Sequence, residues 1–337
     1  MIQLENVSKS FFIVKKAPGL GGSVKSLFVR NKETVEAVKK IDFTIADGEI
    51  VGLLGPNGAG KSTTIKMMTG ILRCDHGRIN INGRDPFRER MKYTKDIGVV
   101  FGQRTQLWWE LPVIESFDII RKIYDVEMAE YNERLKLFDE MLGINQIIHK
   151  PVRNLSLGQR MLCDIAGAFL HNPRIAFLDE PTIGLDLNIK SKIRELILAM
   201  NKKFKTTIIL TTHDISDIKA LCERIIVIDK GSIIYDGNLS EISDLVGQNQ
   251  EVGIYLENIE NNQLLISAVQ SEFAPDEVLD IDVREDYLNI RISNKITVSQ
   301  LMGHILRNEN IKDFTISEPD VEYVIRKVYA GELGNED

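Results

Sequence analysis

The sequence has 337 residues, which is more than one ordinary domain needs and enough chain to bury a substantial core. The formal net charge of -7 argues against a protein whose main partner is nucleic acid. The three cysteines, Cys74, Cys163 and Cys222, form neither a CxxC pair nor a zinc-ligand pattern, so they predict reduced thiols and no disulfide framework.

The first fifty residues predict a β-rich start that a basic insertion interrupts. Residues 2–13 predict a short strand, a polar turn and a second apolar run. Residues 14–34 are basic and Gly-rich, and they predict a solvated surface insertion, with a short amphipathic helix in SVKSLFVR as the alternative. Residues 36–50 predict a strand followed by the turn Ala46-Asp47-Gly48.

Strands alternate with helices from residue 50 to residue 237. Three apolar, β-branched runs predict strands that are buried on both faces, as in a parallel sheet: residues 50–55, 175–179 and 206–212. Helices are predicted over residues 61–72, within 104–172 and over 189–203. Residues 225–237 predict a hairpin with a Lys-Gly turn. This alternation predicts an α/β sandwich.

A second domain is predicted after the character of the chain changes near residues 245–250. The expected order is strand, helix, strand, strand, helix, strand, followed by a last helix over 320–330. This βαββαβ order predicts a small ferredoxin-like α+β domain over residues 250–332. Its acidic cluster is predicted to be solvated charge, and its members are Asp280, Asp282, Glu285 and Asp286.

The string GPNGAGKST matches the phosphate-loop pattern G-x-x-x-x-G-K-[ST], and it lies between a predicted buried strand and a predicted helix. Glycines let the backbone curl so that its N–H groups face a phosphate, and the helix that follows adds its dipole. Lys61 would reach the β- and γ-phosphate oxygens, and Ser62 would offer its hydroxyl to Mg²⁺. The candidate nucleotide-binding residues are Gly55, Pro56, Asn57, Gly58, Ala59, Gly60, Lys61, Ser62 and Thr63.

Two further strand ends carry polar groups that we expect to lie in the same crevice as the phosphate loop. IAFLDEPT places Asp179 and Glu180 at the end of a buried strand, where ligands bind in open α/β sheets. We expect Asp179 to hold the metal and Glu180 to act as general base for the attacking water. His213 ends another apolar strand and is expected to contact the γ-phosphate, although a histidine at a strand end can also be purely structural.

LSLGQ, residues 155–159, lies between the phosphate loop and the IAFLDEP strand, and with these motifs the sequence resembles the ATP-binding subunits of ABC transporters. In that family this signature begins a helix and binds the γ-phosphate of an ATP held by the opposite subunit. The expected contact residues are Leu155, Ser156, Leu157, Gly158 and Gln159. A helix cap made by Ser156 is the alternative reading of the bare pentapeptide.

The resemblance implies roles for three other positions. Gln103 resembles the glutamine that touches Mg²⁺ and senses the membrane partner, although FGQ departs from the usual order. Asp186 resembles the aspartate that links the two ATP sites of a dimer. Phe11, or else Phe12, resembles the aromatic residue that stacks on adenine. The family implies a P-loop ATPase cassette over residues 1–245, with a mixed sheet core and a helical subdomain over 104–172.

The resemblance also implies the working partners. ATP and Mg²⁺ would bind at two sites shared by a homodimer, and no nucleic-acid partner is expected. No stretch approaches the ~18 apolar residues of a membrane span. We therefore expect a cytoplasmic ATPase that is peripheral to the inner face of the cell membrane through a separate multi-span permease.

Three features resemble the exporter group that pairs with ABC-2-type permeases. They are the style of the phosphate loop, Trp108-Trp109 in QLWWELPVIESF, and the tail SEPDVEYVIRKVYAG. A polysaccharide exporter is the main alternative, because such exporters place a basic amphipathic helix where residues 14–34 lie. A non-transport ABC protein of the ribosome or of DNA repair is disfavoured, since the sequence has one cassette and no long coiled coil.

Overall fold

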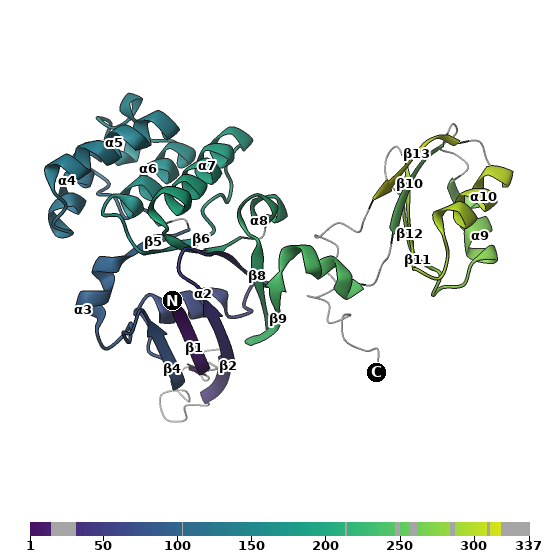
Figure 1. The fold of residues 1–337 in the computed structure, drawn as a ribbon, viewed down its shortest axis with the longest axis horizontal. Helices are drawn as coiled ribbons and strands as arrows, with labels where there is room; N and C mark the ends of the chain where they lie inside the picture. Colours follow the sequence, from purple (N-terminus) through teal and green to yellow (C-terminus); the bar gives the residue numbers. More distant parts are fainter. Residues whose placement is uncertain are drawn as a thin grey trace, which may run out of the picture. The chain divides into compact units, whose positions relative to one another are not determined.

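The computed structural model describes residues 1–14, 32–102, 104–212, 214–246, 250–256, 262–283, 287–308 and 311–317. The chain forms two compact units, Met1–Gly237 and Asn238–Asp337, and each is described by itself (Figure 1). Most of the predicted insertion at 14–34 and the whole predicted helix at 320–330 lie outside the described residues.

The first unit is built on a six-stranded sheet whose order confirms the prediction of an α/β core. From edge to edge its strands are β5 (Ile97–Phe101), β6 (Ile175–Asp179), β7 (Thr207–Thr211), β3 (Ile50–Leu54), β8 (Arg224–Asp229) and β9 (Ser232–Asn238). The first five strands are parallel, and β6 and β7 are buried almost throughout. Lys230 and Gly231, both with positive φ, form the turn between β8 and β9.

A second sheet of β2 (Lys32–Ile45), β1 (Ile2–Val14) and β4 (His76–Ile81) is antiparallel. The predicted polar turn inside residues 2–13 is wrong, because β1 runs through it as one strand. Register shifts between residues 4 and 10 mark irregularities there, and Asn6 adopts a φ of 49° while its N–H donates to Asp42 Oδ1 at 2.7 Å. Bulges therefore absorb the polar residues that the pattern had assigned to a turn.

Helix α2 (Lys61–Met68) lies between the two sheets and shares their core. Ile65, Met67 and Met68 are buried in a cluster with residues of β1 to β4, β6 and β8. The helix was predicted to reach Leu72, but it ends at Met68 because Gly70 follows with a φ of 72°. A Cβ on Gly70 would lie 2.3 Å from the Pro86 carbonyl oxygen, so the chain must turn away at this glycine.

The helices on the other side of the six-stranded sheet form the predicted helical region and its neighbours (Figure 1). They are α4 (Val113–Ile123), α5 (Met128–Leu142), α6 (Leu157–Phe169) and α7 (Leu187–Phe204). Two shorter helices, α3 (Arg90–Tyr93) and α8 (Ile215–Leu221), complete the unit. Nine consecutive residues of α6, Met161 to Phe169, are buried, so this helix is the centre of the helical layer.

His171, just after α6, is a mostly buried histidine that the fold keeps neutral. Its ring stacks on Tyr124 with the centroids 3.8 Å apart, and Nε2 lies 2.9 Å from the Ile97 carbonyl oxygen. Burial lowers the pKa of His171 to about 4 from the ordinary 6.5. Since the folded pKa lies below that of the unfolded chain, the unfolded state binds the proton first. The contribution of the neutral His171 to the free energy of unfolding is therefore fully present above about pH 6.5, and it is lost as the pH falls toward 4.

His171→Gln should remove this pH dependence, because glutamine can still donate to the Ile97 carbonyl but does not titrate. Between about pH 7.5 and pH 5, the wild type should lose about 2 kcal/mol more unfolding free energy than the variant. Urea unfolding of both proteins at the two pH values measures the difference. Equal losses in the two proteins would contradict a neutral, buried His171.

The second unit has the predicted βαββαβ order. Its sheet runs β11 (Val278–Val283), β12 (Leu288–Ile292), β10 (Gln250–Leu256) and β13 (Ile311–Ser317), with every pair antiparallel. Helices α9 (Asn262–Glu272) and α10 (Val298–Asn308) pack buried residues such as Leu265 and Leu301 against Ile254, Ile290 and other inward residues of the sheet.

The two described members of the acidic cluster, Asp280 and Asp282, are exposed, and Asp280 also pairs with a buried arginine. Asp280 accepts from Arg291 Nη1 at 3.2 Å, and Arg291 also pairs with Glu251 on the neighbouring strand. The Arg291 side chain is 6% exposed, so this part of the cluster is an inter-strand ion network. Asp282 is exposed, and Glu285 and Asp286 lie outside the described residues.

Candidate functional site

The loop between β3 and α2 is shaped by two glycines that no other residue could replace. Gly55 has a φ of 151°, and a Cβ there would lie 2.1 Å from the Ile228 carbonyl oxygen. Gly60, the N-cap of α2, has a φ of 116°, and a Cβ there would lie 2.5 Å from the Ala37 carbonyl oxygen. The back of the loop is thus pressed onto backbone of β8 and β2, which fixes its curvature.

The front of the same loop is open. Gly58 has a φ of 84°, and a Cβ there would meet nothing within 4 Å. Asn57 and Gly58 are exposed at the tip, while the Ala59 N–H donates back to the Pro56 carbonyl at 3.1 Å. Ser62 is exposed in the first turn of α2, followed by the half-buried Thr63. The loop therefore presents backbone and one hydroxyl to whatever lies in front of it.

Lys61 folds back over the loop. Its Nζ donates to the Gly55 carbonyl at 2.6 Å and to the Pro56 carbonyl at 3.1 Å. Burial lowers the pKa of Lys61, and the charges of Glu180 and Asp179 oppose that shift. The structure thus brings the lysine of the phosphate loop together with the two carboxylates from the end of β6, as the sequence predicts.

Thr211, the last residue of β7, hydrogen-bonds to both carboxylate residues, Asp179 and Glu180. Its Oγ1 donates to Asp179 Oδ1 at 2.6 Å. The Glu180 N–H donates to the Thr211 carbonyl at 3.0 Å, with Oγ1 also within reach at 3.1 Å. Glu180 has a φ of 53°, a strained value for a non-glycine residue that is common at functional sites. Thr211 therefore holds Asp179 through a side-chain oxygen and Glu180 through its backbone N–H.

Gln103 and His213 both lie outside the described residues, but their chain neighbours are placed. The Gly102 N–H donates to the Asp179 carbonyl at 2.8 Å, so the chain enters position 103 directly beside the end of β6. Thr212 follows β7 and donates from Oγ1 to Asp217 Oδ2 at 3.3 Å. Both positions thus follow strands that end at the same edge as Asp179.

The signature residues begin α6 on a capping box. The Gln159 N–H donates to Ser156 Oγ, and the Ser156 N–H donates to Gln159 Oε1, each at 3.2 Å. Ser156 is thus an N-cap as the alternative reading expected, and the cap leaves Leu157 41% exposed. Gly158 fits closely under Ile189 of α7, since a Cβ on it would lie 3.1 Å from Ile189 Cγ1.

Asp186 is the N-cap of α7, and the segment just before α7 lies beside the signature. Its Oδ1 accepts from the Ile189 N–H at 3.0 Å. A Cβ on nearby Gly184 would lie 3.6 Å from Leu157 Cδ2, so the segment before α7 touches the first turn of α6. The exposed Leu157, Asp186 and Leu187 therefore form one surface at the starts of two helices.

The candidate adenine-stacking residues lie on the exposed part of β1. Phe11 is 37% exposed and Phe12 is 71% exposed. Lys9 Nζ lies 5.6 Å from the centroid of the Phe11 ring. Both rings therefore present an accessible face, and the choice between them stays a prediction.

Sequence reasoning missed two supports of the site. Thr211 was counted only as part of an apolar strand. Asp217 is 1% exposed on α8, and it accepts from Thr182, Thr212 and Arg194, the last through Nε at 2.6 Å. It ties together the segments that follow Glu180 and β7. A buried aspartate in a polar DISD string gives no signal of its own.

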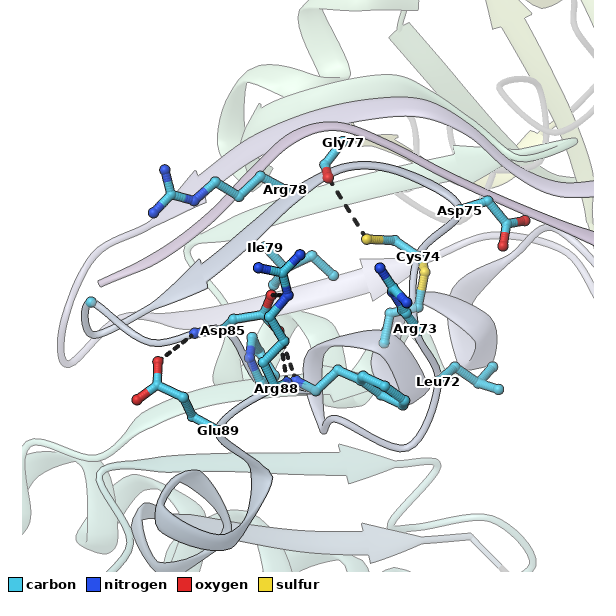
Figure 2. Close-up of a pocket in the computed structure, with 14 residues that line it drawn as sticks. Leu72, Arg73, Cys74, Asp75, Gly77, Arg78, Ile79, Asp85, Arg88 and Glu89 are labelled. Atoms are coloured by element: carbon cyan, nitrogen blue, oxygen red, sulfur yellow. Dashed lines mark hydrogen bonds and ion pairs between the residues drawn. The ribbon is translucent and has the colours of Figure 1, made fainter.

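A cavity of about 510 Å³ lies at the other end of α2 from the phosphate loop (Figure 2). Met67, Cys74 and Phe87 line it together with arginine and acidic side chains. Its carboxylates are used internally: Asp85 accepts from the N–H groups of Phe87 and Arg88 at 3.0 Å. It contains no residue of the predicted ATP site.

Within the described residues, no helix is both long enough and apolar enough to cross a lipid bilayer.

Comparison with known proteins places these motifs in a family. Residues 38–183 match the profile described as "ABC transporter". The chain is 33% identical to the ABC transporter ATP-binding protein NatA of Bacillus subtilis over 64% of this chain and 87% of that protein. It is 29% identical to the linearmycin resistance ATP-binding protein LnrL of the same organism over 96% of both chains. It is 31% identical to the methionine import ATP-binding protein MetN 2 of Enterococcus faecalis over 65% of this chain and 64% of that protein.

Solved structures agree with the sequence relatives. The chain matches cbiO1 of Clostridium perfringens with a TM-score of 0.58 and 30% identity, over 72% of this chain and 89% of that one. It also matches a dimeric post-hydrolysis state of the ATP-binding cassette MJ0796 bound to ADP and Pi, with a TM-score of 0.59 and 26% identity, over 71% of this chain and 98% of that one.

Proposed function

We propose that this chain, which belongs to the ABC transporter family of ATP-binding subunits and is an ATPase, powers export. The export would run through a separate ABC-2-type permease. The observation that supports ATP hydrolysis at this site is that three elements converge on one edge of the sheet. The phosphate loop, the end of β6 and the end of β7 meet where Lys61 lies close to Glu180 and Asp179.

The proposed chemistry divides among these residues. The N–H groups of the loop and Lys61 bind the β- and γ-phosphates, since backbone donors and one cation supply positive potential without bulk. Glu180, whose backbone adopts the left-handed region, accepts the proton of the attacking water. His213 and Gln103 would contact the γ-phosphate and the water from the two adjacent strand ends.

A hard cation fits the donors at this edge. The exposed Ser62 hydroxyl and the Asp179 carboxylate are oxygen ligands of the kind that Mg²⁺ prefers, with Gln103 as a third candidate. Asp179 is oriented by Thr211 Oγ1, which fixes one carboxylate oxygen. When bound, Mg²⁺ would neutralise part of the phosphate charge.

The second half of each site is proposed to come from a partner copy. The capped start of α6 aims Ser156 and the adjacent N–H groups outward, beside the exposed Leu157 and Asp186. A helix N-terminus whose serine O–H can still donate suits a γ-phosphate. The likeness to a cassette that is dimeric with ADP and Pi supports this pairing. ATP would close the pair, and hydrolysis would reopen it.

The two tryptophans support docking of a membrane partner beside Gln103. Trp108 and Trp109 are 40% and 47% exposed, so neither is a core residue. The Arg160 guanidinium lies 5.4 Å from the Trp109 ring centroid and holds it in place. Held, half-exposed tryptophans make good anchors for a protein partner. We therefore propose that the chain works at the inner face of the cell membrane.

Export is favoured over import because the resistance protein aligns over more of this chain than the methionine import protein does. LnrL, named for resistance to linearmycin, aligns over 96% of both chains and so includes the second unit. The methionine import protein aligns over 65% of this chain. A polysaccharide exporter remains the second candidate because of the basic residues at 14–34, most of which lie outside the described residues.

A pull-down from the membranes of cells that produce the protein tests the transport role. The tagged chain should co-purify with a multi-span membrane protein, because the exposed tryptophans anchor it. The Trp108→Ala, Trp109→Ala double variant should lose that protein and still bind ATP. Recovery of ribosomes or DNA-repair proteins in place of a membrane protein would contradict the proposal.

A further inference from the structure

The cavity at the far end of α2 has a buried, apolar base. Met67 of α2 and Ile79 of β4 belong to its lining and are 1% and 6% exposed. The half-buried Leu72 and the 42% exposed Phe87 add apolar surface nearer the solvent. The volume of about 510 Å³ lies within the range of roughly 300–1,000 Å³ that small-molecule sites occupy. The cavity therefore has the size and the base of a ligand site.

The carboxylates around the cavity are already bonded within the protein. Asp75 accepts from Lys9 Nζ at 2.6 Å. Asp85 accepts from two backbone N–H groups of the turn that follows it, each at 3.0 Å. Glu89 accepts from the Asp85 N–H at 3.3 Å. These carboxylates therefore hold the protein's own chain together, and the charged groups with bonding capacity to spare are arginines.

Three arginines line the cavity, and two of them lie near its centre. Within the part of the chain that the structure describes, the Arg73 side chain makes no hydrogen bond or ion pair. Arg88 pairs with Asp85 through Nε at 3.5 Å, which leaves the donors of its two Nη groups for a ligand. Figure 2 shows the Arg73 guanidinium beside Cys74 and the Arg88 guanidinium beside Asp85. Arg78 also lines the cavity, but its side chain extends away from the other two (Figure 2).

The Cys74 thiol lies within electrostatic reach of both kinds of charge. Burial raises the pKa of Cys74 above its ordinary value, Asp85 adds to that shift, and Arg73 opposes it. The sulfur is half-buried and lies 3.8 Å from the Gly77 carbonyl oxygen. A ligand held by the arginines would therefore cover this thiol.

We propose that this cavity binds a phosphate group joined to an apolar group, at a site separate from the ATP site. A phosphate monoester carries about -1.5 to -2 charges at neutral pH, which two guanidinium groups balance. Arg73 and Arg88 donate to the phosphate oxygens, because the planar fork of a guanidinium matches them. The apolar group lies against Met67, Leu72 and the accessible ring of Phe87.

The phosphate group has two sources with the same chemistry, a soluble phosphate ester and the headgroup of an anionic lipid. The inference does not rest on the proposed function, because no residue of this lining belongs to the predicted ATP site.

The test follows the rate at which Cys74 of the full chain reacts with N-ethylmaleimide, with and without phenyl phosphate. Cys74 is half-buried, whereas Cys163 and Cys222 are buried. Mass spectrometry of the labelled peptides assigns the reaction to Cys74, so binding is read at the cavity itself. Protection is a ratio of two rates within one variant, so a change in the reactivity of the thiol cancels.

Saturating phenyl phosphate should slow the labelling of Cys74 at least about fivefold. Arg73→Gln and Arg88→Gln should each raise the concentration for half protection at least about fivefold, because each removes charge-assisted hydrogen bonds. Phe87→Ala should bring the affinity for phenyl phosphate down to that for inorganic phosphate, because the aromatic contact is lost.

Two further variants are controls. Arg90→Gln removes an exposed arginine of α3 that does not line the cavity, and it should leave protection within twofold of wild type. Lys61→Met alters the opposite end of α2 and should leave protection unchanged as well. Loss of protection in Lys61→Met would assign the phosphate to the phosphate loop and overturn the proposal.

Vesicles separate the two sources. Protection by phenyl phosphate supports the site with a soluble ester as its ligand. Protection only by phosphatidylcholine vesicles that contain phosphatidic acid, and not by phosphatidylcholine alone, supports it with a lipid headgroup. Absence of protection in every arm, or protection that is equal in wild type and in the Arg73→Gln, Arg88→Gln double variant, would overturn it. If Cys74 reacts too slowly to follow, equilibrium dialysis of phenyl phosphate against Lys61→Met, with and without the two arginine changes, makes the same comparison.

Discussion

Replacing Glu180 by glutamine should lower the ATPase rate by at least about 100-fold and leave the chain dimeric in ATP and Mg²⁺, because a general base contributes roughly 10² to 10⁴. Glutamine preserves the size of the side chain and leaves the backbone bond from residue 180 to Thr211 intact. ATP binding is therefore retained while proton removal is lost. Steady-state phosphate release and size-exclusion chromatography with and without ATP measure the two effects.

Two variants make this prediction specific. Glu195→Gln removes a carboxylate on α7 that bonds only Ser191 among the described residues, and it should leave the rate within twofold of wild type. Adding Ser156→Arg to Glu180→Gln should abolish the ATP-dependent dimer, because a bulky cation then occupies the start of α6. A Glu180→Gln chain that stays monomeric in saturating ATP would count against shared sites.

Replacing Lys61 by methionine should weaken ATP binding by about 100-fold or more and remove measurable hydrolysis. Hydrogen bonds from a charged donor contribute about 1.5–3 kcal/mol each, and 1.4 kcal/mol is a factor of ten in affinity. Lys61 Nζ bonds two carbonyls of its own loop, so bound phosphates would take over a cation that is already in place. Methionine keeps the length and the apolar stem, so the loop should keep its shape.

Lys66→Met is the matched control for the lysine. It lies on the same helix and is exposed, and it should leave the Kd of a fluorescent ATP analogue within twofold of wild type. Thermal unfolding of both variants reports whether the fold is kept. An equal loss of affinity in Lys61→Met and Lys66→Met would contradict the prediction. It would show that ATP affinity depends on the total charge of the helix and not on the contact between Lys61 and the phosphates.

The strand runs and the phosphate loop were predictable because local sequence determines them. The apolar stretches at 50–55, 175–179 and 206–212 became parallel strands, since such runs exclude a solvated face. The glycines of the loop carry their own signal, because positive φ and close backbone contact exclude other residues.

What escaped prediction depends on residues far apart in the chain. The continuity of β1 is set by pairing with β2 and β4, which let bulges absorb its polar residues. Thr211 supports Asp179 from a strand 32 residues away, and Asp164 receives Thr105 from 59 residues away. The spacing of side chains along one segment does not indicate which distant residues will bond to them.

The place of β3 in the middle of the six-stranded sheet has a consequence during synthesis. Both of its neighbours, β7 and β8, are translated after most of the first unit. At about 5–20 residues per second, the ribosome needs on the order of ten seconds or more to deliver them after β3 emerges, since they lie roughly 150 residues later. An apolar strand waits unpaired through that interval, so a nascent chain stalled before β7 should depend on chaperones to avoid aggregation.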